Sequence, residues 1–127
     1  MISKYFDKVK NEINSYSHVV ENYQLNEKVY SEVLGFIEGE LFFPDESRLA
    51  FAEVKDIEQP SKIKYHYHYM NKNDETIFRY DNAKHHTEIM TFPHHKHLPD
   101  GIVESSEPEI NLILTEIEAI ILKNKEL

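Results

Sequence analysis

The chain has 127 residues, the length of one ordinary domain, and we predict a single α+β domain over residues 1–127. It contains no cysteine, which excludes disulfides, thiolate zinc sites and a cysteine nucleophile. The formal net charge of −9 argues against general binding of nucleic acid. Residues 60–100 differ from the acidic ends, because they carry six Lys/Arg against five Asp/Glu and seven of the eight histidines.

The N-terminal segment is predicted to be an amphipathic helix, because apolar residues recur at three- and four-residue steps from Ile2 to Tyr23. Ser3 is the expected N-cap of this helix. Charged residues interrupt the segment, so it does not have the pattern of a secretory signal, and no apolar run elsewhere reaches the length of a membrane span. We therefore expect a cytoplasmic protein that does not associate with membranes.

An antiparallel meander is predicted to follow this helix. Its expected strands span residues 29–43, 48–57, 62–70, 75–80 and, less regularly, 87–92, before a loop that runs through residue 97. Two glycines in the first of them suggest a bend or a bulge. Alternation in the third strand places three tyrosines on one face of the sheet and both His66 and His68 on the other.

A C-terminal helix is predicted from a capping box formed by Ser106 and Glu109, followed by a buried stripe between Ile110 and Ile121. This order of elements predicts an α+β fold with an N-terminal helix, a four- to five-stranded antiparallel meander sheet, and a C-terminal helix packed on one sheet face. The opposite face of such a sheet can remain open to solvent.

Residues suited to chemistry begin in the strand over 62–70 and the segment after it. His66 and His68 lie on one face, where they could share a metal ion with a third ligand, act as general acid and base, or simply decorate a strand surface. Arg79 is one of only two arginines and can bind a phosphate or pair with Asp81. The Asp81–Asn82 pair is also typical of a turn that ends a strand.

A third block, residues 92–97, holds three histidines and Lys96 in a spacing that matches no zinc signature. Histidine, arginine, lysine and tyrosine without cysteine suit metal-free cleavage of a phosphodiester, with histidines moving protons and cations stabilising the phosphate. Tyr65, Tyr67, Tyr69 and Tyr80 could stack on bases. Glu53 could orient a histidine, although an ordinary exposed position is the simpler interpretation.

Three strings of this segment, Tyr67-His-Tyr69, Phe78-Arg-Tyr-Asp-Asn-Ala-Lys-His-His86 and Phe92-Pro-His-His-Lys-His97, resemble the TumE family. Lys84 stands where that family has proline, so only the local turn differs. The resemblance implies a toxin neutralised by a separately encoded antitoxin, typically a helix-turn-helix DNA-binding protein. The layout is also similar to that of small toxin ribonucleases.

Carried over by position, the candidate catalytic residues are His68, Arg79, Asp81, His85, His86, His94, His95, Lys96 and His97. The candidate substrate-binding residues are Tyr67, Tyr69, Tyr80 and Asn82. We expect neither a metal nor another cofactor at this site.

The sequence therefore predicts a toxin of a two-gene system that acts as a metal-independent ribonuclease. Two alternatives stay open at this point, a protein-binding module without catalysis and a histidine-rich site for a divalent metal. Besides the antitoxin, the candidate partners are RNA or the ribosome and a second copy of the chain.

Overall fold

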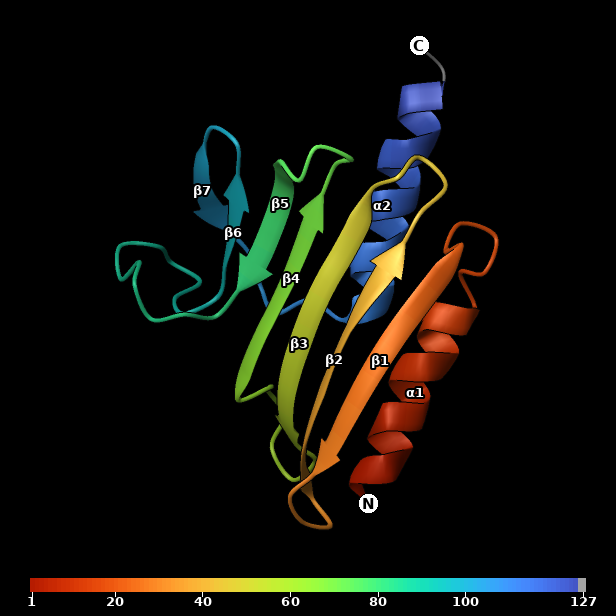
Figure 1. Ribbon diagram of the computed structural model, residues 1–127. Helices are drawn as coiled ribbons and strands as arrows, with labels where there is room; N and C mark the ends of the chain where they lie inside the picture. The colour runs from red at the N-terminus through yellow and green to blue at the C-terminus, as the bar shows by residue number, and fades with distance from the viewer. Residues whose placement is uncertain (126–127) are drawn as a thin grey trace.

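The computed structural model describes residues 1–125. One sheet of seven strands runs through the middle of the molecule, and both helices lie behind it as seen in Figure 1. The elements in chain order are α1 (Ile2–Asn14), β1 (Asn22–Val29), β2 (Leu34–Phe42), β3 (Arg48–Asp56), β4 (Lys64–Met70), β5 (Thr76–Asp81), β6 (His95–Leu98), β7 (Gly101–Glu104) and α2 (Ile110–Lys125). The α+β class and the two terminal helices are thus confirmed, and the predicted count of four to five strands is wrong.

The sheet is a simple antiparallel meander, in which each strand pairs with the next strand along the chain from β1 to β7. Side chains alternate between the two faces of such strands. On one face they join the apolar side chains of α1 and α2 in a single core. The other face carries no helix in the described chain, which agrees with the prediction that one face can remain open to solvent (Figure 1). We call it the open face.

Three local predictions fail at the helix ends. Helix α1 stops at Asn14 instead of continuing to Tyr23, because the chain turns and enters β1 at Asn22. The N-cap of α1 is Met1 rather than Ser3. Helix α2 begins at Ile110, and the backbone N–H of Ile113 donates to the carbonyl of Glu109, so Ser106 lies too far upstream to cap the helix.

Three predictions also fail within the sheet. Residues 87–92 form turns, and the strand after β5 lies later, at His95–Leu98, in the segment expected to be a loop. No bulge occurs at the two glycines of β2, because its register with β1 and β3 is continuous. Instead, a Cβ atom on Gly39 would lie 2.5 Å from the carbonyl oxygen of Gln24, so the close approach of β1 requires glycine there.

Candidate functional site

Two rows of polar side chains cross the open face where β4, β5 and β6 run side by side. The strand register places Arg79 opposite both His68 and His97, and it places Asp81 opposite both His66 and His95. Residues two apart on a strand share a face, so both rows project to the same side of the sheet. We call these rows the arginine row, His68–Arg79–His97, and the aspartate row, His66–Asp81–His95.

Asp81 is the most heavily bonded member of the rows, although it is only 5% exposed. Its Oδ1 accepts a hydrogen bond from the backbone N–H of Ala83 at 3.0 Å, and its Oδ2 accepts one from Arg79 Nε at 3.1 Å. His95 Nε2 also lies 2.9 Å from Oδ1. Burial opposes ionisation of this carboxyl group, but the hydrogen bond from Ala83 and the nearby Arg79 and His95 lower its pKa overall.

These contacts confirm two interpretations of the sequence around Asp81. Arg79 does pair with Asp81, and the bond from Ala83 N–H closes the predicted turn after the strand. Since only Nε of Arg79 is used in this pair, the two Nη groups have no hydrogen-bond acceptor within residues 1–125. The Arg79 side chain is 37% exposed, so these groups face solvent on the open face.

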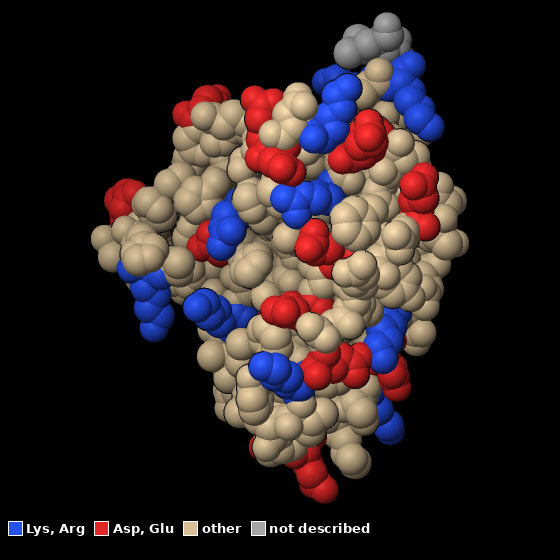
Figure 2. Space-filling view, viewed as in Figure 1, with Lys and Arg blue, Asp and Glu red and all other residues tan. Residues whose placement is uncertain are grey.

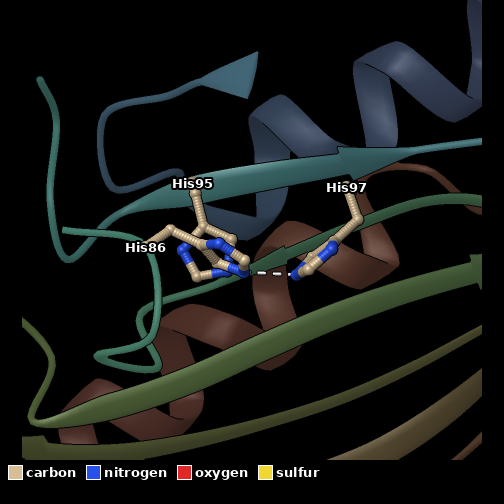
Figure 3. Close-up of side chains that lie close together, drawn as sticks. All are labelled: His86, His95 and His97. Carbon is tan, nitrogen blue, oxygen red and sulfur yellow. Dashed lines mark hydrogen bonds between the residues drawn. The ribbon is translucent and has the colours of Figure 1, made fainter. Parts of the chain in front are cut away.

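His95 is held by the chain immediately before it. Its Nδ1 donates to the carbonyl of Pro93 at 2.9 Å, and its Nε2 lies 3.0 Å from Nε2 of His97. His86, from the loop between β5 and β6, brings its ring against both, with centroids 4.9 Å from His95 and 5.8 Å from His97. Figure 3 shows the three imidazoles turned toward one another. One buried and two partly exposed imidazoles therefore meet beside Asp81.

Burial is the main influence on the other histidines of the rows. It lowers the pKa of both His66 and His68, and the positive charge of Arg79 lowers each further. The pKa of His97 is also lowered by burial, and by His95 and His86, while Asp81 acts in the opposite direction. His68 Nε2 lies 2.7 Å from the hydroxyl of Thr76, which orients its ring.

Three of the predicted catalytic side chains lie apart from both the rows and His86. Lys96 projects from the opposite face of β6, where its Nζ donates to Glu116 of α2 at 2.6 Å and lies 4.8 Å from the ring centroid of Tyr80. His94 stacks on Tyr65 and has its Nδ1 2.8 Å from that hydroxyl. His85 is exposed in the loop after β5. The structure therefore brings together six of the nine candidates, namely His68, Arg79, Asp81, His86, His95 and His97.

The predicted substrate-binding residues have structural roles in the fold. Tyr67 and Tyr69 are 0% exposed on the helix-covered face, so their rings are not available to stack on a ligand. Tyr80, which is also buried, donates from its hydroxyl to Glu116. Asn82 accepts a hydrogen bond from the backbone N–H of Tyr65 at 3.1 Å and thereby anchors the start of β4.

Glu53 likewise differs from the simpler interpretation of the sequence, because it is only 1% exposed. It accepts hydrogen bonds from the hydroxyls of Tyr5 and Tyr67, and burial raises its pKa. This glutamate lies on the helix-covered face, so it does not orient any histidine of the rows.

A hollow of about 460 Å³ lies on the open face beside the rows, and the sequence analysis did not find it. Ala50 and Ala52 pair with His68 and His66 and leave room because their side chains are small. Amide and carboxylate side chains from β1 and β2 form the far wall, and His66 forms the near wall. The two alanines at alternate positions of a strand were the available signal, since small residues there leave a depression in a sheet surface.

Charges of both signs are mixed on this face. Figure 2 shows Lys and Arg side chains interspersed with Asp and Glu, rather than gathered into one basic patch. Within the described chain, neither helix combines the length and the apolar character needed to cross a bilayer.

The comparison with protein families decides the assignment, since a model described as toxin TumE matches residues 9–121. The chain belongs to the TumE toxin family. The matched range includes both rows and His86, so the expected resemblance to TumE is confirmed, and with it the role of toxin in a toxin–antitoxin system. TumE membership also implies an antitoxin as partner. Searches of curated proteins and of solved structures each found no significant match.

Proposed function

We propose that this TumE-family toxin cleaves RNA without a metal ion, at the arginine row. The observation that carries the proposal is the strand register, which sets Arg79 between His68 and His97 on an open sheet face. Neighbouring strands lie about 4.8 Å apart, so the two histidines flank the arginine with backbones about 10 Å from each other. A phosphate bound to the free Nη groups of Arg79 would then have an imidazole on each side.

This arrangement suits transfer of a phosphodiester to a neighbouring hydroxyl. One histidine of the row takes the proton of the ribose 2′-hydroxyl, and the 2′-oxygen forms a bond to phosphorus. The bond from phosphorus to the 5′-oxygen breaks, and the other histidine gives that oxygen a proton. The products are a 2′,3′-cyclic phosphate and a 5′-hydroxyl, while Arg79 stabilises the negative charge that develops on the phosphate oxygens.

The hollow beside His66 supplies room for a nucleoside next to the bound phosphate. Its wall carries Gln24, Asn26, Glu38 and Glu40, whose amides and carboxylates can bond base edges but do not attract a second phosphate. Mixed charges and the net charge of −9 make strong binding of bare RNA unfavourable. We therefore expect modest, salt-sensitive affinity for short single strands, and better substrates where another body, such as the ribosome, presents the RNA.

The two arginines of the chain provide a matched test. Arg79→Ala removes the proposed phosphate ligand, whereas Arg48→Ala removes an arginine of the same face that lies outside both rows and pairs with Glu40 and Asp74. We expect growth arrest on induction of the wild type and of Arg48→Ala, and none with Arg79→Ala. Purified untagged wild type should cleave a short RNA in the presence of EDTA and leave a cyclic phosphate.

Chemical controls separate this mechanism from others. A strand with a single 2′-deoxynucleotide at the cleaved position should resist cleavage, because it lacks the attacking hydroxyl. Cleavage that EDTA abolishes, or that proceeds equally on the deoxy strand, would refute the metal-independent mechanism. Growth arrest with intact RNA would retain the toxin and exclude the nuclease, and no arrest in any strain would favour a protein-binding module.

The remaining expectations about partners depend on the same family assignment. We propose that a separately encoded antitoxin of the helix-turn-helix class neutralises this chain, and that a second copy of the chain is a further candidate partner. An RNA substrate would locate its action in the cytoplasm, where RNA and ribosomes are found.

A further inference from the structure

The cluster of His86, His95 and His97 has the composition of a metal site rather than of an ordinary surface. One nitrogen atom from each ring lies within 4.8 Å of those from the other two (Figure 3). Imidazole nitrogen is a preferred ligand of Zn²⁺ and of similar borderline divalent ions. Two of the ligands come from alternate positions of β6, which fixes their spacing, and the third comes from the loop before it.

The most buried of the three histidines already has the outer contact that metal-binding histidines normally make. His95 Nδ1 donates to the carbonyl of Pro93, and a carbonyl can only accept, so the proton of a neutral ring resides on Nδ1. The lone pair of Nε2 is then directed toward His97, whose Nε2 is 3.0 Å away. A backbone carbonyl on the far nitrogen is typical of histidines that ligate metals, because it fixes the tautomer and the ring orientation.

Asp81 lies against two of the three histidines and is the candidate for a fourth ligand. Its Oδ1 lies 2.9 Å from His95 Nε2, and its Oδ2 lies 3.3 Å from His97 Nε2. Ligands held at about 2.0 to 2.1 Å from a tetrahedral zinc are about 3.3 Å from one another, so these separations are close to what coordination needs. Arg79 holds Oδ2, and Oδ1 retains a lone pair beyond its bond to Ala83 N–H.

We propose that His86, His95 and His97, together with Asp81, bind one divalent transition-metal ion, with Zn²⁺ the best match. This inference rests in part on the proposed function, because His97 belongs to both the metal cluster and the arginine row. A bound ion occupies the imidazole lone pair that proton transfer requires. Metal binding and RNA cleavage therefore exclude each other, and the ion acts as an inhibitor of the toxin.

The first experiment measures binding alone, on protein purified without a histidine tag. Titration with Co²⁺, followed by its visible absorption, and with Zn²⁺, followed by calorimetry, should give one site per chain. His86→Ala should weaken that site by at least about 100-fold, since it removes a direct ligand and loss of an outer-shell partner alone costs about 10- to 100-fold. His85→Ala is the matched control, because the adjacent exposed histidine lies outside the cluster. At the same concentration, Zn²⁺ should also raise the melting temperature of the wild type more than that of His86→Ala.

Wild type that binds neither ion, or an equal loss of affinity in His85→Ala and His86→Ala, would overturn the site. The second experiment compares cleavage rates without and with Zn²⁺, and we expect the ratio to be large in the wild type and near one in His86→Ala. Zinc that accelerates cleavage would overturn the exclusion. If the protein binds zinc but never cleaves RNA, the nuclease proposal is wrong and the metal site stands. If it cleaves RNA but does not bind zinc, the metal site is wrong and the nuclease proposal stands.

Discussion

Tyr67 and Tyr69 of β4 allow a charged and a neutral buried hydrogen bond to be compared within one strand. Both side chains are 0% exposed, and each hydroxyl is bonded inside the core. Tyr67 donates to the carboxyl group of Glu53, and Tyr69 donates to the hydroxyl of Ser47 at 2.8 Å. Replacing either with phenylalanine removes one hydroxyl and leaves the ring, so the two variants differ chiefly in the partner that loses its donor.

The difference between these partners sets the expected magnitudes. A hydrogen bond between neutral groups contributes about 1 kcal/mol to the free energy of unfolding, and one to a charged group contributes about 1.5 to 3 kcal/mol. At a pH where Glu53 is ionised, we therefore expect Tyr67→Phe to lose about 1 kcal/mol more than Tyr69→Phe. Glu53 keeps its second donor, Tyr5, so the carboxyl group is not left entirely without partners.

The excess loss in Tyr67→Phe should also grow with pH. Burial raises the pKa of Glu53, and the hydrogen bond from Tyr67 partly offsets that rise by favouring the ionised form. Removing this bond raises the folded-state pKa further, so stability is retained below the unfolded-state pKa and its decline continues to a higher pH than in the wild type.

Urea unfolding of wild type and both variants, at about pH 6 and about pH 9, measures these losses. Ionisable groups that are unaffected by either substitution contribute equally to both variants, so their effects cancel when the two variants are compared. Equal losses in the two variants at both pH values would refute a Tyr67 hydrogen bond that strengthens as Glu53 ionises.

Further predictions concern the core and can be measured in the same unfolding assay. Glu53→Gln should flatten the decline of stability as the pH rises above the unfolded-state pKa of glutamate. The raised folded-state pKa of Glu53 makes the wild type less stable over that range, and an unchanged slope would contradict this. Gly39→Ala should cost about 3 kcal/mol, since its Cβ would lie 2.5 Å from a backbone oxygen of Gln24, and a near-neutral result would exclude this close approach. Lys62→Met should cost about 2 kcal/mol, because it leaves the carbonyl of Pro108 without its buried donor at 2.9 Å; an unaltered urea midpoint would argue against that bond.

Strands with regular alternation could be predicted from the sequence, and those without it could not. The pattern around His66 and His68 fixed β4 and its faces, because tyrosines and histidines alternate there without interruption. Strand β1 is an exposed edge with little apolar contrast between its faces, and Val20 and Tyr23 continue the spacing of the preceding helix. The prediction therefore extended α1 through a turn and missed the first strand.

The site was predicted in composition but not in arrangement. If His95–Leu98 had been recognised as a strand, its alternation would have predicted Lys96 on the opposite sheet face from His95 and His97. The burial of Glu53 could similarly have been predicted, because it lies two residues after Phe51 and four after Leu49 and therefore on the same buried face of β3. The pairing of Arg79 with two particular histidines depends on the register of three strands, which no local pattern specifies.

The loop between β5 and β6 contributes one ligand, His86, and none of the members of either row. Because β6 pairs directly with β5, replacing the His86 side chain leaves Arg79 facing His97. Relatives could therefore gain or lose metal control by a single substitution at this position of the loop, while both rows stay in place. Inhibition by zinc could then be gained or lost in evolution without a change in the residues of the arginine row.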